Sequence, residues 1–170
     1  MALSNTGRGA TRDWLGGGEN VRTKDAAVLH QAPEMFLSML VMDGVLNRHP
    51  KLRGACVELG AGWVPEMLRR LDAVSRAYRK VDESVAFARK PSEQITEQMG
   101  FTPMPHEDVG NMMSQSSSDL FLFSSDYPHI EGTRDPIGRF ESSMSEVSEE
   151  AKTQFYSENF LRIWPQARAH

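Results

Sequence analysis

Apolar residues recur at helical spacing in three separate stretches of the chain. They predict helices over residues 33–48, 64–80 and 148–164, each with one apolar face. Pro33, Pro50 and Pro165 suit the start or the stop of these helices, and Ser148 suits an N-cap. The apolar and capping pattern assigns these residues to the buried faces: Met35, Phe36, Met39, Leu40, Leu46, Val64, Met67, Leu68, Leu71, Val74, Tyr78, Ala151, Phe155, Tyr156, Asn159, Phe160, Ile163 and Trp164.

Short apolar runs between the helices predict three β-strands, over residues 52–59, 100–104 and 120–123. The last run has four consecutive large apolar residues, which is typical of a strand buried on both faces. A further helix is expected over residues 105–113, a cap at Ser92 and a long loop over residues 127–143. Strands that alternate with helices predict an α/β fold with parallel strands and helical crossovers.

The first 32 residues differ in composition from the rest of the chain. Five of the thirteen glycines lie between Gly7 and Gly18, with no buried strand before them. Neither the Walker spacing nor the dinucleotide spacing is met, so a phosphate-binding protein is the weakest hypothesis. We therefore expect an irregular Gly-rich lead-in at 1–32, one α/β domain at 33–165 and a tail at 166–170.

Composition and charge exclude several classes of protein. The net charge of −4 gives no electrostatic reason to expect nucleic acid or an anionic membrane as partner. No apolar run approaches the ~20 residues that span a bilayer, and the N-terminus lacks the apolar stretch of a secretion signal. Cys56 is the single cysteine, so an intrachain disulfide is impossible. A cytoplasmic location is expected by default.

Acidic residues follow two of the predicted strands. Asp126 comes after the buried run, and Glu58 comes after the run that ends in the Gly60–Gly62 turn. A carboxylate at the carboxyl end of a parallel strand is where α/β enzymes commonly place a metal ligand or a general base. The plainer alternatives stay open: Asp126 as a loop acid, and Glu58 in a salt bridge or hydrogen-bonded to the turn.

Other residues with possible chemistry favour structural roles. His129 follows Asp126 closely and is either a pocket residue or a structural loop histidine, and Trp63 is a packing anchor or a substrate wall. His106 precedes two acids, but consecutive side chains there point in different directions, so metal binding is not expected. Cys56, within a predicted strand, is expected to be a small buried hydrophobe.

Three blocks of sequence, in order, carry a resemblance to a known family. They are GVLNRHPKL with VELGAGWVP over residues 44–65, FSSDYPH over residues 123–129, and SEEAK with ENFLRIW over residues 148–164. Together they resemble the C-terminal part of the amidohydrolase-related family, also called amidohydrolase 2. Its members are metal-dependent hydrolases and decarboxylases on a (β/α)8 barrel, so the resemblance implies a partial barrel of about the last three β/α units.

The resemblance also implies roles for individual residues. Asp126 matches the family's acid at the end of the eighth strand, which binds the metal or accepts a proton from the attacking water. Glu58, Trp63 and His129 would shape the pocket for a small-molecule substrate. The implied cofactor is a divalent metal, zinc, in the complete barrel. The implied reaction is attack of water on an amide, ester or lactone carbonyl, or decarboxylation of an aromatic acid.

The chain departs from the family in its histidines and its length. None of the five histidines forms the His-x-His pair of the family's first strand, and a complete barrel needs about 250 residues. Metal ligands from the first half are therefore missing. We expect a homo-oligomer or a complementary barrel half as partner. The alternative is a non-catalytic α/β module that pairs with another chain through open strand edges.

Overall fold

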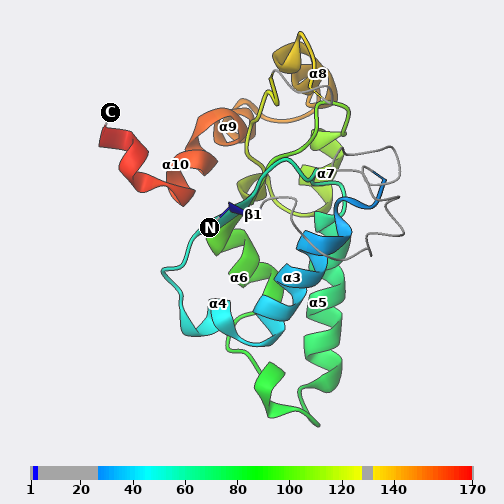
Figure 1. Ribbon diagram of the computed structural model, residues 1–170, viewed down its shortest axis with the longest axis vertical. Coiled ribbons are helices and arrows are strands. Elements are labelled where there is room, and N and C mark those ends of the chain that lie inside the picture. The colour runs from blue at the N-terminus through cyan, green and yellow to red at the C-terminus, as the bar shows by residue number, and fades with distance from the viewer. Residues whose placement is uncertain (1, 4–26, 128–131, 170) are drawn as a thin grey trace, which may run out of the picture.

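The computed structural model describes residues 2–3, 27–127 and 132–169 (Figure 1). Its sheet has three parallel strands in the order β1-β2-β3: β1 (Ala2–Leu3), β2 (Gly54–Cys56) and β3 (Met99–Phe101). The fold is α/β and mostly helical, as the alternation of elements predicts. Strand β1 lies in the lead-in that was expected to be irregular, and residues 4–26, with all five of its glycines, are outside the described residues. The Cα register pairs Ala2 with Ala55, Leu3 with Cys56, Gly54 with Met99, and Cys56 with Phe101.

The predicted strand over residues 120–123 is wrong as a full strand. The 3₁₀ helix η2 (Ser118–Leu120) covers its start, and only Phe121 forms a bridge, parallel to Phe101. The backbone N–H of Leu122 donates to the Phe101 carbonyl at 2.8 Å. The backbone N–H of Phe123 donates to Phe155 at 3.0 Å, so a helix takes the hydrogen bond that a longer strand would make. Leu120, Phe121 and Leu122 are nevertheless buried, as predicted, and Phe123 is partly buried.

One predicted helix, over residues 33–48, is two: α3 (Gln31–Met42) and α4 (Val45–Arg48). The break falls at Gly44, whose φ of +70° is left-handed and suits glycine. The Arg48 guanidinium donates to the Asp43 carbonyl at 2.6 Å and stabilises the connection. The local apolar pattern continues through the break, which is why it predicts a single helix.

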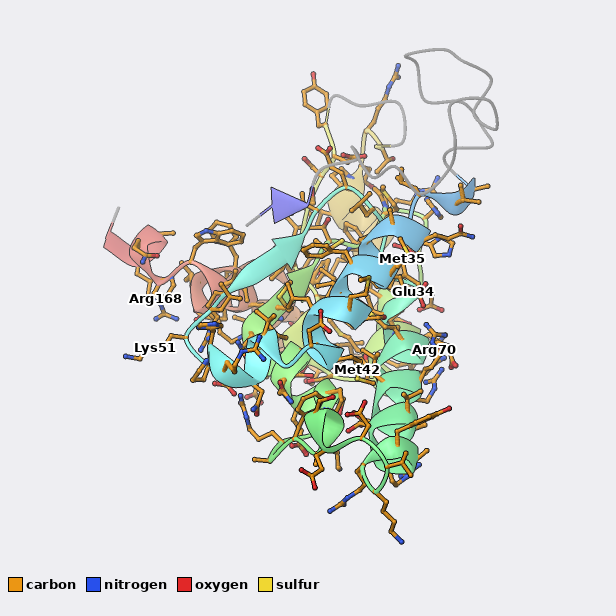
Figure 2. The ribbon with its side chains drawn as sticks, turned by 60° about the horizontal axis from the view of Figure 1, so that its bottom comes forward. Glu34, Met35, Met42, Lys51, Arg70 and Arg168 are labelled. Carbon is orange, nitrogen blue, oxygen red and sulfur yellow. The ribbon has the colours of Figure 1, made fainter. Side chains whose placement is uncertain are left out.

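The face that α3 buries is not the predicted one. Met35, Phe36 and Met39 are 57 %, 38 % and 59 % exposed, whereas Leu37 and Val41 are buried. The helix carries apolar residues on all of its sides, so the pattern does not decide which side meets the core. The helix's single acid, Glu34, forms an ion pair with Arg70 of the neighbouring helix (Figure 2).

Helix α5 (Val64–Tyr78) confirms its prediction, with proline in its first turn. Its last turns extend past the core, so Val74 and Tyr78 are exposed rather than buried. The 3₁₀ helix η1 (Glu83–Val85) and helix α6 (Pro91–Gln98) follow. Ser92 does not cap α6; it lies inside the helix and donates from its N–H and hydroxyl to Asp72. Helices α3, α5 and α6 pack together (Figure 1).

Two helices follow β3, and each begins at an aspartate that caps it. Helix α7 (Val109–Gln115) begins later than predicted because Asp108 accepts a hydrogen bond from the N–H of Asn111 at 2.9 Å. Helix α8 (Pro136–Ser143) occupies part of the expected loop, which is a correction. Asp135 caps it and accepts from the N–H of Gly138 at 2.9 Å. Its short length and central glycine hide it from the apolar pattern.

The C-terminal helix is continuous in path but not in hydrogen bonding. It consists of α9 (Glu149–Thr153), the π-helical turn η3 (Gln154–Glu158) and α10 (Asn159–Ile163); the 3₁₀ helix η4 (Pro165–Ala169) follows. Ser148 caps α9, as predicted. Residues spaced by four positions are buried: Phe155, Asn159 and Ile163. Phe160, one position further along the helix, points away and is 46 % exposed, which corrects its assignment.

The core lies between the sheet and the helices that pack on it. Helices α6 and α10 both contact β3. An aromatic cluster of Phe123, Phe140, Phe155 and Tyr156 fills the region where α8 and the C-terminal helix meet. No helix in the described part of the chain combines the length and apolar character needed to cross a bilayer.

Candidate functional site

The carboxyl ends of the parallel segments carry the two predicted acids. Glu58 lies two residues after β2, and Asp126 lies after the segment that bridges to β3. Because these segments run parallel, their carboxyl ends meet at one edge of the sheet. Glu58 has a φ of 62° and Asp126 a φ of 54°, and no other non-glycine residue in the described ranges has a positive φ. Such backbone strain is concentrated at functional sites.

The loops after β2 and β3 are joined through Thr102. Its hydroxyl accepts a hydrogen bond from the backbone N–H of Glu58 at 3.1 Å, and its own N–H donates to the Cys56 carbonyl at 3.1 Å. Thr102 is buried, whereas the Glu58 side chain is exposed. Thr102 is not among the predicted site residues; a polar residue directly after an apolar strand is the signal that points to it.

A second carboxylate, that of Glu107, binds the turn after β2. It accepts from the N–H groups of Ala61 at 3.0 Å and Gly62 at 2.7 Å, and from that of Met104 at 2.7 Å. Glu58 was one candidate for a hydrogen bond to the Gly60–Gly62 turn, but the carboxylate that binds this turn is that of Glu107. Glu107 therefore ties the loop after β3 to the start of α5.

Trp63 is a packing anchor at the N-cap of α5. Its indole N–H donates to the Gly60 carbonyl at 3.0 Å, and its ring meets that of Phe101 edge-on at 5.6 Å. The packing role of Trp63 is therefore supported, because both its ring and its indole N–H have partners in the fold. A role as substrate wall stays a prediction.

The C-terminal helix holds the segment that leads to Asp126. The side-chain amide of Asn159 donates to the carbonyls of Ser118 at 2.7 Å and Phe121 at 2.9 Å. Arg162 donates to the carbonyl of Asp119 at 2.6 Å from the same helix, and burial lowers the pKa of its guanidinium. Both carboxylate oxygens of Asp126 are shielded from solvent. Asn159 and Arg162 were not predicted to be site-supporting residues.

The described residues do not by themselves fit a resident metal ion. Nowhere in residues 2–3, 27–127 and 132–169 do three His, Cys, Asp or Glu side chains come together as a metal-binding group. His106 is exposed, and that it binds no metal stays a prediction. His129, the predicted pocket residue nearest to Asp126 in sequence, lies outside the described residues.

Cys56 is a buried strand residue, as predicted, and burial raises the pKa of its thiol from 9.0 to about 12. Because the thiolate is the reactive form, this pKa lowers the reactive fraction at pH 8 about a thousandfold. We expect a thiol reagent at pH 8 to modify the native chain at least a hundredfold more slowly than the denatured chain. Equal rates in the two states would contradict burial of this thiol.

No protein-family model matches the chain, and no curated protein matches it. Solved structures do match. Amidohydrolase map2389c from Mycobacterium avium subsp. paratuberculosis K-10 superposes with a TM-score of 0.75 at 24 % identity, over 95 % of this chain and 41 % of that protein. 5-Carboxyvanillate decarboxylase LigW from Sphingomonas paucimobilis superposes with a TM-score of 0.63 at 18 % identity, over 80 % of this chain and 40 % of that protein.

A third match is IDCase from Metarhizium anisopliae in its apo form. Its TM-score is 0.59 at 16 % identity, over 93 % of this chain and 46 % of that protein. The chain thus spans less than half the length of each of these three proteins. Its structural neighbours are amidohydrolase-family proteins, which confirms the resemblance seen in the sequence, and the chain shares their fold over 80–95 % of its own length.

Proposed function

We propose that this chain is the C-terminal segment of a metal-dependent hydrolase or decarboxylase of the amidohydrolase type. The fold that it shares with amidohydrolase map2389c over 95 % of its length is the observation that carries the proposal. In this proposal the parallel strands and crossover helices are about the last three β/α units of a (β/α)8 barrel. The site then lies at the carboxyl ends of the strands, where such barrels place their chemistry.

Asp126 is the central residue of the proposed site. It accepts a proton from water as the water oxygen attacks the carbonyl carbon of an amide, ester or lactone, or it acts in the decarboxylation of an aromatic acid. Its shielded carboxylate and left-handed backbone hold the acid in one orientation after the segment that bridges to β3, which favours a positioned base. Glu58, Trp63 and His129 shape the pocket for a small-molecule substrate.

The proposed cofactor is a divalent metal, zinc, with Asp126 among its ligands. Since the described residues do not fit a metal on their own, the remaining ligands in this proposal come from outside the described residues. A second copy of the chain or a complementary barrel half can supply them. The edge position of β1 in the sheet supports such association, because an edge strand has backbone groups free to pair with another strand.

The non-catalytic pairing module is the less favoured alternative. It shares the open strand edges with the first proposal but predicts neither metal binding nor a role for Asp126. The three neighbours named above include a protein named as an amidohydrolase and one named as a decarboxylase, which favours an enzyme. The metal content of the purified chain distinguishes the two proposals, because only the first predicts bound metal.

We expect zinc to bind to associated species of the chain and to be lost when Asp126 is replaced by alanine, because a carboxylate ligand is removed. The measurement is metal content and mass across a size-exclusion profile, on protein purified without chelator and dialysed against a zinc salt. Asp135→Ala, which removes the exposed carboxylate that caps α8, is the matched control and should keep its zinc.

Zinc retained by Asp126→Ala, or absent from every species of the unchanged chain, would contradict the proposed site. Zinc bound stoichiometrically to a monomer would instead contradict the need for a partner. Associated species without zinc would favour the non-catalytic module.

A further inference from the structure

The Glu107 side chain lies between two loops that leave neighbouring strands at their carboxyl ends. Its Oε1 is 2.7 Å from the Gly62 nitrogen, and its Oε2 is 3.0 Å from the Ala61 nitrogen and 2.7 Å from the Met104 nitrogen. Three backbone N–H groups therefore converge on one carboxylate. Two of them directly precede α5, whose positive dipole end favours a negative charge at this position.

The glycines of the turn are fitted to this carboxylate. A Cβ at Gly62 would lie 2.9 Å from Glu107 Oε1, and a Cβ at Gly60 would lie 3.2 Å from the same atom. Gly60 also has a φ of +65°, which side-chain-bearing residues rarely adopt. The absence of side chains at Gly60 and Gly62 thus leaves room for the Glu107 carboxylate to reach the backbone of the turn.

Two predicted pocket residues flank this turn. Glu58 precedes the turn; its backbone is strained, and its N–H donates to the Thr102 hydroxyl. Trp63 follows the turn, and its indole N–H donates to the Gly60 carbonyl. Met104 belongs to the loop that leaves β3, the loop in which Thr102 also lies. One carboxylate consequently sets the spacing between the two loops that carry these groups.

We propose that Glu107 is a positioning residue that clamps the turn between Glu58 and Trp63 to the loop after β3, and so holds both pocket residues in place. This inference rests on the proposed function, which puts the pocket at this edge of the sheet. Glu107 itself contacts backbone rather than the pocket residues, so it acts through the turn. Neither the family resemblance nor the spacing of residues in the sequence assigned it this role.

The test measures the turn directly and uses neither metal nor substrate. Trp14→Phe and Trp164→Phe leave Trp63 as the one tryptophan, and its emission is recorded in that background together with amide exchange at Ala61 and Gly62. In Glu107→Ala we expect exchange at these two amides to rise about 10- to 100-fold, the factor that a lost hydrogen bond to a charged group gives. Trp63 emission should move to longer wavelength.

Acetate provides a rescue that a general loss of stability would not show. It is a free carboxylate, and Glu107→Ala leaves room for it beside the three N–H groups, so acetate should restore the Trp63 emission where chloride at equal ionic strength does not. Glu107→Gln keeps an acceptor oxygen and should be affected less than Glu107→Ala. Glu66→Gln removes an exposed charge from the first turn of α5 and should change neither signal.

Exchange at Ala61 and Gly62 that stays as in the unchanged chain would overturn the clamp. Exchange that rises equally at the buried amides of β2 and α5, without acetate rescue, would also overturn it, because Glu107 would then act on global stability. Should Glu107→Ala fail to fold, exchange at Ala61 and Gly62 is compared with exchange at the buried amides of β2 and α5 in Glu107→Gln instead. A chain that passes this test but binds no zinc leaves the clamp standing and overturns only the proposed function.

Discussion

Replacing Phe155 with alanine is expected to lower the free energy of unfolding by about 3–5 kcal/mol, the usual cost of removing a large aromatic side chain from a core. Phe155 is completely buried, and its ring lies 5.1 Å from Phe140, 5.1 Å from Tyr156 and 6.1 Å from Phe123. The cavity would open where α8 and the C-terminal helix meet, and three aromatic partners would lose contacts together.

Phe160→Ala is the matched control, because it removes the same side chain from the next turn of the same helical stretch. Phe160 is 46 % exposed and contacts Trp164 at the surface. We expect its loss to cost roughly 1 kcal/mol. Urea denaturation followed by circular dichroism measures both variants. Equal effects of the two substitutions would show that the aromatic cluster is not a core.

The sequence predicts elements well where polar and apolar positions separate cleanly. Helix α5 is the clearest case, since Met67, Leu68 and Leu71 are buried while its arginines and Glu66 face solvent. Helix α3 is the opposite case. Met35 and Met39 are as apolar as Leu37 and Val41, so the pattern predicts a helix but leaves its rotation open. Which side of α3 is buried depends on the helices packed against it, α5 and α6, and those contacts are not local.

The run over residues 120–123 shows why a buried segment is not always a strand. Its burial was predicted correctly from four consecutive apolar residues, but a ladder also needs a partner along its length. Phe101 supplies one rung, and the Phe155 carbonyl takes the N–H of Phe123. Whether such a run becomes a strand depends on groups far away in the sequence.

The positions of Glu58 and Asp126 followed from local sequence, because Glu58 comes directly after an apolar run and Asp126 follows another after two serines. Their supports did not follow. Glu107 binds residues 45 and 46 positions away, and Asn159 binds residues 38 and 41 positions away. No periodicity links such residues. A polar residue within an apolar stripe, as Asn159 is, signals a buried hydrogen bond but not its partner.

Asn159→Asp is expected to cost about 3–5 kcal/mol at neutral pH, the range for a buried charge left without a partner. Asn159 is 2 % exposed and donates both amide hydrogens to backbone carbonyls, those of Ser118 and Phe121. An ionised aspartate has the same shape but no hydrogen to donate, so its charge would face two acceptor oxygens. The size of the side chain is unchanged, and the effect is therefore one of hydrogen bonding and charge.

The pH dependence of this variant separates its charge from its shape. The pKa of the new carboxyl group should be raised in the folded chain, since burial and the carbonyl oxygens favour its protonated form. The folded state then binds more protons than the unfolded state, so the variant's stability relative to the unchanged chain falls as pH rises above the unfolded value of about 3.9. Below that value the protonated acid can donate one hydrogen bond, and the deficit should shrink.

Urea denaturation of both chains at pH 7 and at mildly acidic pH measures this difference. Asn111→Asp is the control: Asn111 is exposed in the first turn of α7, where a negative charge suits the helix dipole, so a change within about 0.5 kcal/mol is expected. A deficit at Asn159 that does not grow with pH would mean that the amide does not donate to the two carbonyls. The same hydrogen bonds hold the segment that ends at Asp126, so zinc binding in Asn159→Asp should weaken even under conditions where the chain is still folded.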